Sequence, residues 1–126
     1  MSKWRQQAFV QLPALRRQLG REKTLYGFCG ELYDELCRAY EGQNEDLIRD
    51  IFIYSKWCLN QPRNGTIAND PPTAIIVCFF EHLPEKEKVR KDLARHFSRE
   101  FLISMEKVFQ YHGSEDQYFE IIDSSS

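Results

Sequence analysis

The chain has 126 residues, 42% of them hydrophobic and 13% aromatic, and a net charge of -2. This length fits one domain with one core, and the apolar content argues against disorder before the C-terminal tail. The longest apolar run, residues 74–80, is far shorter than the roughly 20 residues that span a bilayer. Since the sequence also begins without an export signal, we expect a cytoplasmic protein with no membrane segment.

Apolar residues recur at spacings of three and four along most of the chain, which predicts an all-α fold. Short connections between such helices favour a compact bundle or a short stack of about six antiparallel helices. We expect residues 1–113 to form a single helical domain and residues 114–126 a C-terminal tail, partly docked or disordered. The six helical segments are expected at about 4–19 (kinked or divided at Pro13), 25–40, 45–59, 71–83, 85–97 and 99–111.

The apolar run at residues 74–80 could instead be a buried strand, because it is rich in β-branched residues. A strand here could pair with residues 118–122. Asp70 followed by Pro71 is typical of a helix cap and first turn, and favours a helix.

The third segment, residues 45–59, has apolar side chains around most of its circumference, which is typical of a central helix. Trp57 lies among them. We expect it to be a buried structural anchor, packed on both sides, and not a binding residue.

The four cysteines contain no C-x-x-C pair and lie among apolar residues, which predicts four reduced thiols. Cys29 and Cys37, eight residues apart on one helix, are too far apart to share a zinc ion. We therefore expect no metal site and no cofactor.

Motifs for phosphate binding, dinucleotide binding and nucleophilic catalysis are missing from the sequence, so we expect no enzymatic activity and assign no catalytic residue. Glu81 and His82 form the best titratable pair. Adjacent helical side chains point about 100° apart, however, so we expect one of the two to be buried and the other solvated.

Charge is unevenly distributed along the chain. Residues 1–23 carry six basic groups against one acid, and residues 24–50 carry seven acids against two arginines. The two blocks can neutralise each other across packed helices or face partners, and the sequence leaves both possibilities open.

A protein-binding module without enzymatic activity is the function that this pattern favours, because an acidic helix and a long loop can both meet a partner. The candidate interaction surface comprises Glu31, Asp34, Glu35, Arg63, Asn64 and Asn69. A nucleic-acid-associated protein is the alternative, and its candidate phosphate contacts are Arg16, Arg17, Arg21 and Lys23. The acidic net charge weighs against nucleic acid, while a small-ligand binder and the oligomeric state stay open.

Several stretches in order, residues 12–15, 30–33, 46–52 and 69–83, give the chain a resemblance to small bacterial helical domains without an assigned activity. This resemblance implies a helical fold and brings no catalytic residue. Some bacterial families of this size are immunity proteins that neutralise a toxin by binding it. An inhibitor of that kind, with a protein as its partner, is what the resemblance implies here.

Overall fold

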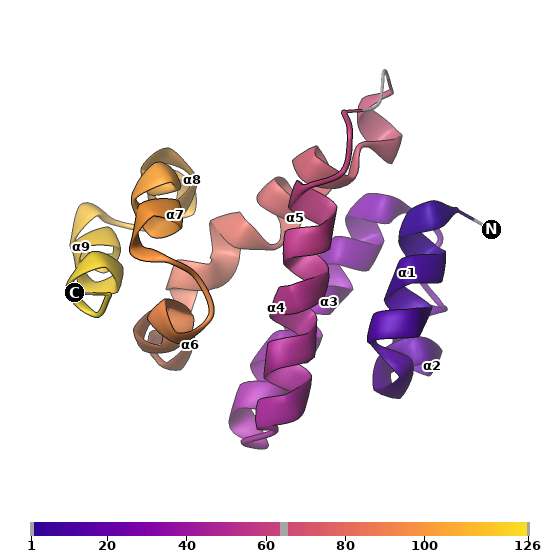
Figure 1. Ribbon diagram of the computed structural model, residues 1–126, viewed down its shortest axis with the longest axis horizontal. Helices are drawn as coiled ribbons and strands as arrows, with labels where there is room; N and C mark the ends of the chain where they lie inside the picture. The colour runs from indigo at the N-terminus through magenta and orange to yellow at the C-terminus, as the bar shows by residue number, and fades with distance from the viewer. Residues whose placement is uncertain (1, 64–65, 126) are drawn as a thin grey trace. The chain divides into compact units, whose positions relative to one another are not determined.

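The computed structural model describes residues 2–63 and 66–125, and all regular elements in these ranges are helical (Figure 1). The all-α class is confirmed. Residues 71–78 and 118–122 both lie in helices, so the strand pairing considered for them is wrong. The contacts divide the chain into two compact units, Met1–Phe79 (unit 1) and Phe80–Ser126 (unit 2). Within the described ranges, no helix combines the length and the apolar character needed to cross a membrane.

Unit 1 contains five α-helices: α1 (Lys3–Gln11), α2 (Arg16–Leu19), α3 (Leu25–Glu41), α4 (Glu45–Leu59) and α5 (Pro71–Cys78). The expected first helix is divided at Leu12, which leaves the helical region (φ -127°, ψ 56°) because the following Pro13 disfavours it there. Short 3₁₀ turns at Pro13–Leu15 and Ile67–Asn69 complete the unit.

Two long helices, α3 and α4, form the centre of unit 1 and run antiparallel, joined by residues 42–44 (Figure 1). Their predicted caps are confirmed, since the Thr24 side chain accepts from Gly27 N and that of Asn44 from Leu47 N. Helix α5 packs against both, and α1 packs against α4.

Aromatic side chains fill the core of unit 1. Phe28 and Tyr54 are fully buried, and the Trp4 ring meets Phe28 edge-on at 4.9 Å between centroids. The Tyr54 hydroxyl donates to the Trp4 carbonyl at 2.9 Å, a buried hydrogen bond that fastens α1 to α4. This bond holds the start of α1 beside the second half of α4.

Unit 2 is built from shorter pieces: the 3₁₀ segment Phe80–Glu85 (η3), α6 (Glu87–Asp92), the 3₁₀ turn Leu93–Arg95, α7 (Arg99–Ser104), α8 (Glu106–His112) and α9 (Glu115–Asp123). The expected helices at 85–97 and 99–111 are each divided, the second at Met105. The helix expected at 71–83 ends at Cys78, and the 3₁₀ segment η3 begins two residues later, at Phe80.

Residues 115–123, expected to lie in a tail, contribute helix α9 to unit 2. Ser114 and Gln117 form a reciprocal capping box at its start, and Tyr118, Ile121 and Ile122 are buried. The single domain expected over residues 1–113 remains a prediction, because the division at residue 79 does not by itself show whether the two units unfold together.

Candidate functional site

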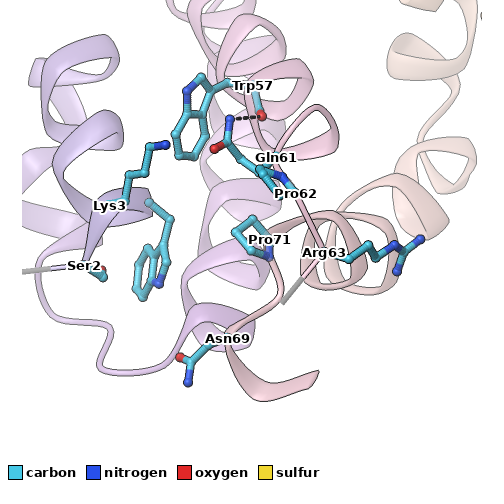
Figure 2. A pocket seen from close by; sticks show the side chains of 9 residues that line it. Ser2, Lys3, Trp57, Gln61, Pro62, Arg63, Asn69 and Pro71 are labelled. Atoms are coloured by element: carbon cyan, nitrogen blue, oxygen red, sulfur yellow. Dashed lines mark hydrogen bonds between the residues drawn. The ribbon is translucent and has the colours of Figure 1, made fainter. Parts of the chain in front are cut away.

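An open groove of about 660 Å³ on unit 1 is the main candidate site, and we call it the Trp57 groove (Figure 2). Its walls come from the start of α1, the end of α4, the loop that follows α4, and the start of α5. Its volume lies within the roughly 300–1,000 Å³ of ligand sites in proteins. The lining residues are Ser2, Lys3, Trp4, Trp57, Gln61, Pro62, Arg63, Asn69 and Pro71.

Trp57 is partly exposed, so it is not the fully buried anchor that the sequence predicts. One face of its indole stacks on Tyr54, with 5.8 Å between ring centroids and 18° between planes. Trp57 lies in the last turn of α4, where a loop and not another helix turn follows, and part of the ring stays accessible in the groove. Gln61 Nε2 donates to the Trp57 carbonyl at 3.1 Å and fixes the start of that loop.

Trp4 is the other large aromatic ring of the groove, and it is buried, with 8% of its surface exposed. The Arg5 guanidinium lies 4.8 Å from its ring centroid, a cation–π contact. Next to it, Lys3 is exposed at the first residue of α1. The groove therefore combines a buried and a partly exposed indole with a cation at its edge.

Two of the predicted loop residues, Arg63 and Asn69, lie in this groove and are exposed. Arg63 Nη1 donates to Thr73 Oγ1 at 2.7 Å and to Asp70 Oδ2 at 3.3 Å. Asp70 is 2% exposed and caps α5 by accepting from Thr73 N, as the sequence predicts. These bonds tie the loop to α5. Asn64, the third predicted loop residue, lies outside the described residues.

The three predicted acidic residues of α3 do not form one exposed face. Asp34 is exposed, Glu31 is partly buried, and Glu35 is only 6% exposed and pairs with Arg38. Neighbouring helical positions point about 100° apart, which turns Glu35 towards the body while Asp34 faces solvent. Arg38 also contacts Glu31 at 3.3 Å, so a cation of the same helix offsets this acidic block.

The basic residues predicted as phosphate contacts, namely Arg16, Arg17, Arg21 and Lys23, are all exposed. Arg21 lines a second concavity of about 440 Å³ together with Gln18, Glu22, Glu31, Glu35 and Arg38. Because three carboxylates share that concavity with two arginines, its charges offset each other.

Unit 2 contains a polar cluster that sequence reasoning missed. The buried Glu81 contacts His112 Nε2 through Oε1 at 3.2 Å, and His82 Nδ1 contacts Glu85 Oε1 at 2.6 Å. The two imidazole rings stack, with 4.9 Å between centroids and 14° between planes. As predicted, Glu81 is buried while His82 is partly exposed, but each pairs with another residue. Within the described ranges, no group of three or more His, Cys, Asp or Glu residues is arranged to hold a metal ion.

All four cysteines are reduced thiols, as the sequence predicts, and Cys29 and Cys58 are buried. Burial raises the pKa of Cys58 to about 12 and also raises the pKa of Cys29. Both side chains are therefore protonated at neutral pH, which makes them poor nucleophiles.

Comparison of the chain with family models, with curated proteins and with solved structures gives no match. The resemblance to small bacterial helical domains stays a prediction from sequence. The candidate site is thus defined by the geometry of the Trp57 groove, in which an accessible indole, a buried indole and two cationic side chains line one opening.

Proposed function

We propose that the protein is a protein-binding module without enzymatic activity, and that it holds its partner through the Trp57 groove. The observation that carries the proposal is the partly exposed indole of Trp57 in an open groove on the body of unit 1. Tryptophan and arginine are the residues in which the binding energy of protein interfaces concentrates, and the groove has both. Tyr54 supports the indole from behind, so little side-chain entropy is lost on binding.

A protein partner suits this groove better than a small molecule does. Small-molecule sites enclose about 70–90% of their ligand, whereas this groove is open along one side. A partner that extends past the groove can bury the ring and also contact the rim, where Arg63 and Asn69 are exposed.

The nucleic-acid alternative has less support. Arg21, one of the four basic residues it needs, lies in a concavity with three carboxylates, which weakens attraction for phosphate. We extend the protein-binding proposal to a bacterial cytoplasmic setting and to an inhibitor of the immunity type. The free thiols support the cytoplasm, and the sequence resemblance supports the inhibitor.

Site-specific photocrosslinking in the native host tests this proposal. A benzophenone amino acid replaces Asn69 at the groove or, as the matched control, Val10, which is 75% exposed and does not line it. We expect one dominant protein adduct from position 69 that is absent from position 10 and is lost when Trp57→Ala is added. Equal adducts from both positions, or an adduct that survives Trp57→Ala, would contradict the proposal.

A further inference from the structure

The charge of the Trp57 groove indicates what kind of segment it binds. Two of its nine lining residues, Lys3 and Arg63, are cationic, and none is a carboxylate. Lys3 is exposed, and it forms no ion pair with any residue that the structure describes. Arg63 pairs with the buried Asp70, but its side chain is 71% exposed. The charge of Arg63 is thus offset by Asp70, and Lys3 adds one unpaired positive charge at the edge of the groove, beside an apolar ring.

The polar residues of the groove favour an extended segment over a helix. Ser2, Gln61 and Asn69 can form hydrogen bonds with the unpaired backbone groups of an extended chain. A helix has already paired those groups internally, and it offers a cylinder about 10–12 Å wide. Extended segments that contain proline also pack well on aromatic grooves, since proline restricts the chain before it binds.

We infer that the Trp57 groove binds an extended acidic segment of a partner protein. In this arrangement, a proline or aliphatic side chain packs on the Trp57 indole, and a flanking carboxylate lies within reach of Lys3. The inference rests on the proposed function and specifies the chemistry of the partner. Charge complementarity commits the site to an acidic segment, because a basic one would meet the unpaired charge of Lys3 and no carboxylate among the lining residues.

A library of random 12-residue peptides displayed on phage, selected on the full chain, tests the inference. Phage that also bind the Trp57→Ala variant are removed. We expect the remaining peptides to carry a net negative charge and at least one proline or aliphatic residue. One selected peptide, synthesised with a fluorescent label, provides Kd by anisotropy.

Lys3→Glu should weaken the binding of that peptide at least tenfold, and added salt should weaken binding to the wild-type chain. Arg17→Glu makes the same charge change on α2, outside the groove, and should alter Kd less than twofold. Trp57→Phe retains an aromatic ring against Tyr54, so it checks that lost binding does not come from lost folding.

The outcomes separate the two proposals. Selected peptides that depend on Trp57 but are basic, or that ignore Lys3→Glu, overturn the acidic segment and leave the groove as the binding site. If every phage enriched on the wild-type chain also binds Trp57→Ala, so that none is left after this removal, both proposals are overturned. A selection that enriches no sequence overturns the inference, while the crosslinking experiment still decides the proposed function.

Discussion

The two units differ in the length of the helices that surround their cores. Unit 1 depends on two long helices, α3 and α4, whose aromatic side chains pack in a continuous core around Phe28 and Tyr54. Unit 2 has α-helices of six to nine residues around a core of its own, in which Phe80 meets Phe97 edge-on at 5.7 Å between centroids. Polar side chains also link these short helices. Arg90 Nη1 donates to the Pro84 carbonyl at 2.7 Å, and Arg99 Nη1 donates to the Ile122 carbonyl at 2.8 Å.

This difference shows why the candidate site lies on unit 1. A binding groove needs rigid elements around it, and the buried bond from Tyr54 to Trp4 fixes α1 against α4 at the groove. The difference also predicts that unit 2, with its shorter helices, depends more than unit 1 on the polar side chains that link its helices, in addition to its buried aromatic rings. Both tryptophans lie in unit 1, so tryptophan fluorescence reports that unit alone.

Phe28→Ala should have the largest effect. Phe28 is fully buried between Trp4 and Tyr54, and removing a buried phenylalanine costs about 3–5 kcal/mol of unfolding free energy. Urea unfolding followed by tryptophan fluorescence measures this loss. The matched control is Phe119→Ala in unit 2, where the ring is 48% exposed and the expected loss is below about 1 kcal/mol. Equal losses would show that burial does not set the contribution of Phe28.

Alkaline pH should have the next largest effect, by lowering the unfolding free energy of unit 1. The folded state holds the Cys58 proton up to a pKa of about 12, whereas the unfolded thiol loses it near 9.0, so unfolding is favoured as pH rises between these values. The unfolding free energy should fall by on the order of 1.4 kcal/mol per pH unit from this thiol. Burial raises the pKa of Cys29 and Tyr54 too, which adds to the fall. Urea unfolding at pH 8, 9 and 10 measures the slope, and Cys58→Ala should flatten it; an unchanged slope would contradict this cause.

Removing one polar link tests the other half of the comparison. Arg90 is 13% exposed in its side chain and also contacts Glu120 at 3.2 Å. Arg90→Met leaves Glu120 and the Pro84 carbonyl without this donor, and should cost about 2–3 kcal/mol in urea unfolding followed by circular dichroism. Lys88→Met on the same helix removes an exposed charge and should cost less than about 0.5 kcal/mol. If both variants lose the same stability, polar links are not what holds unit 2.

Trp57→Ala should cost less stability than the truncation of a fully buried aromatic residue. Because its ring is half-buried and contacts the groove, we expect a loss of about 1–2 kcal/mol, below the 3–5 kcal/mol of a fully buried aromatic. A thermal melt measures it, with Trp57→Phe as the conservative control. A loss as large as that of Phe28→Ala would make Trp57 a core residue after all.

The sequence predicted the long helices well because their signals are local. For α3 and α4, the apolar stripe and the capping residues Thr24 and Asn44 all indicate the same boundaries. The short helices of unit 2 have too few turns for a clear hydrophobic periodicity. The sequence therefore does not predict the breaks at Met105 and before Glu87.

The candidate site was harder to predict because it is formed where the ends of several helices meet in the fold. Apolar residues on all sides of α4 made Trp57 look buried, yet periodicity does not show that the neighbouring helix leaves part of this turn uncovered. Loop composition predicts Arg63 and Asn69, whereas Lys3 has no such local signal, because the packing of α1 on α4 is what brings the start of α1 to the groove. The pairing of His112 with Glu81 joins residues 31 positions apart, and only the His82–Glu85 spacing gave a local signal.

The most direct test of the Trp57 groove is an NMR titration that follows the two indole N–H signals of the chain, from Trp4 and Trp57. Titrating the ¹⁵N-labelled protein with the selected acidic peptide should shift the Trp57 signal strongly, because its ring is the accessible one, and the buried Trp4 signal less. Trp57→Phe removes one of the two signals and so assigns both. Unchanged indole signals, with peptide-induced shifts confined to residues of unit 2, would show that the partner does not bind in the groove.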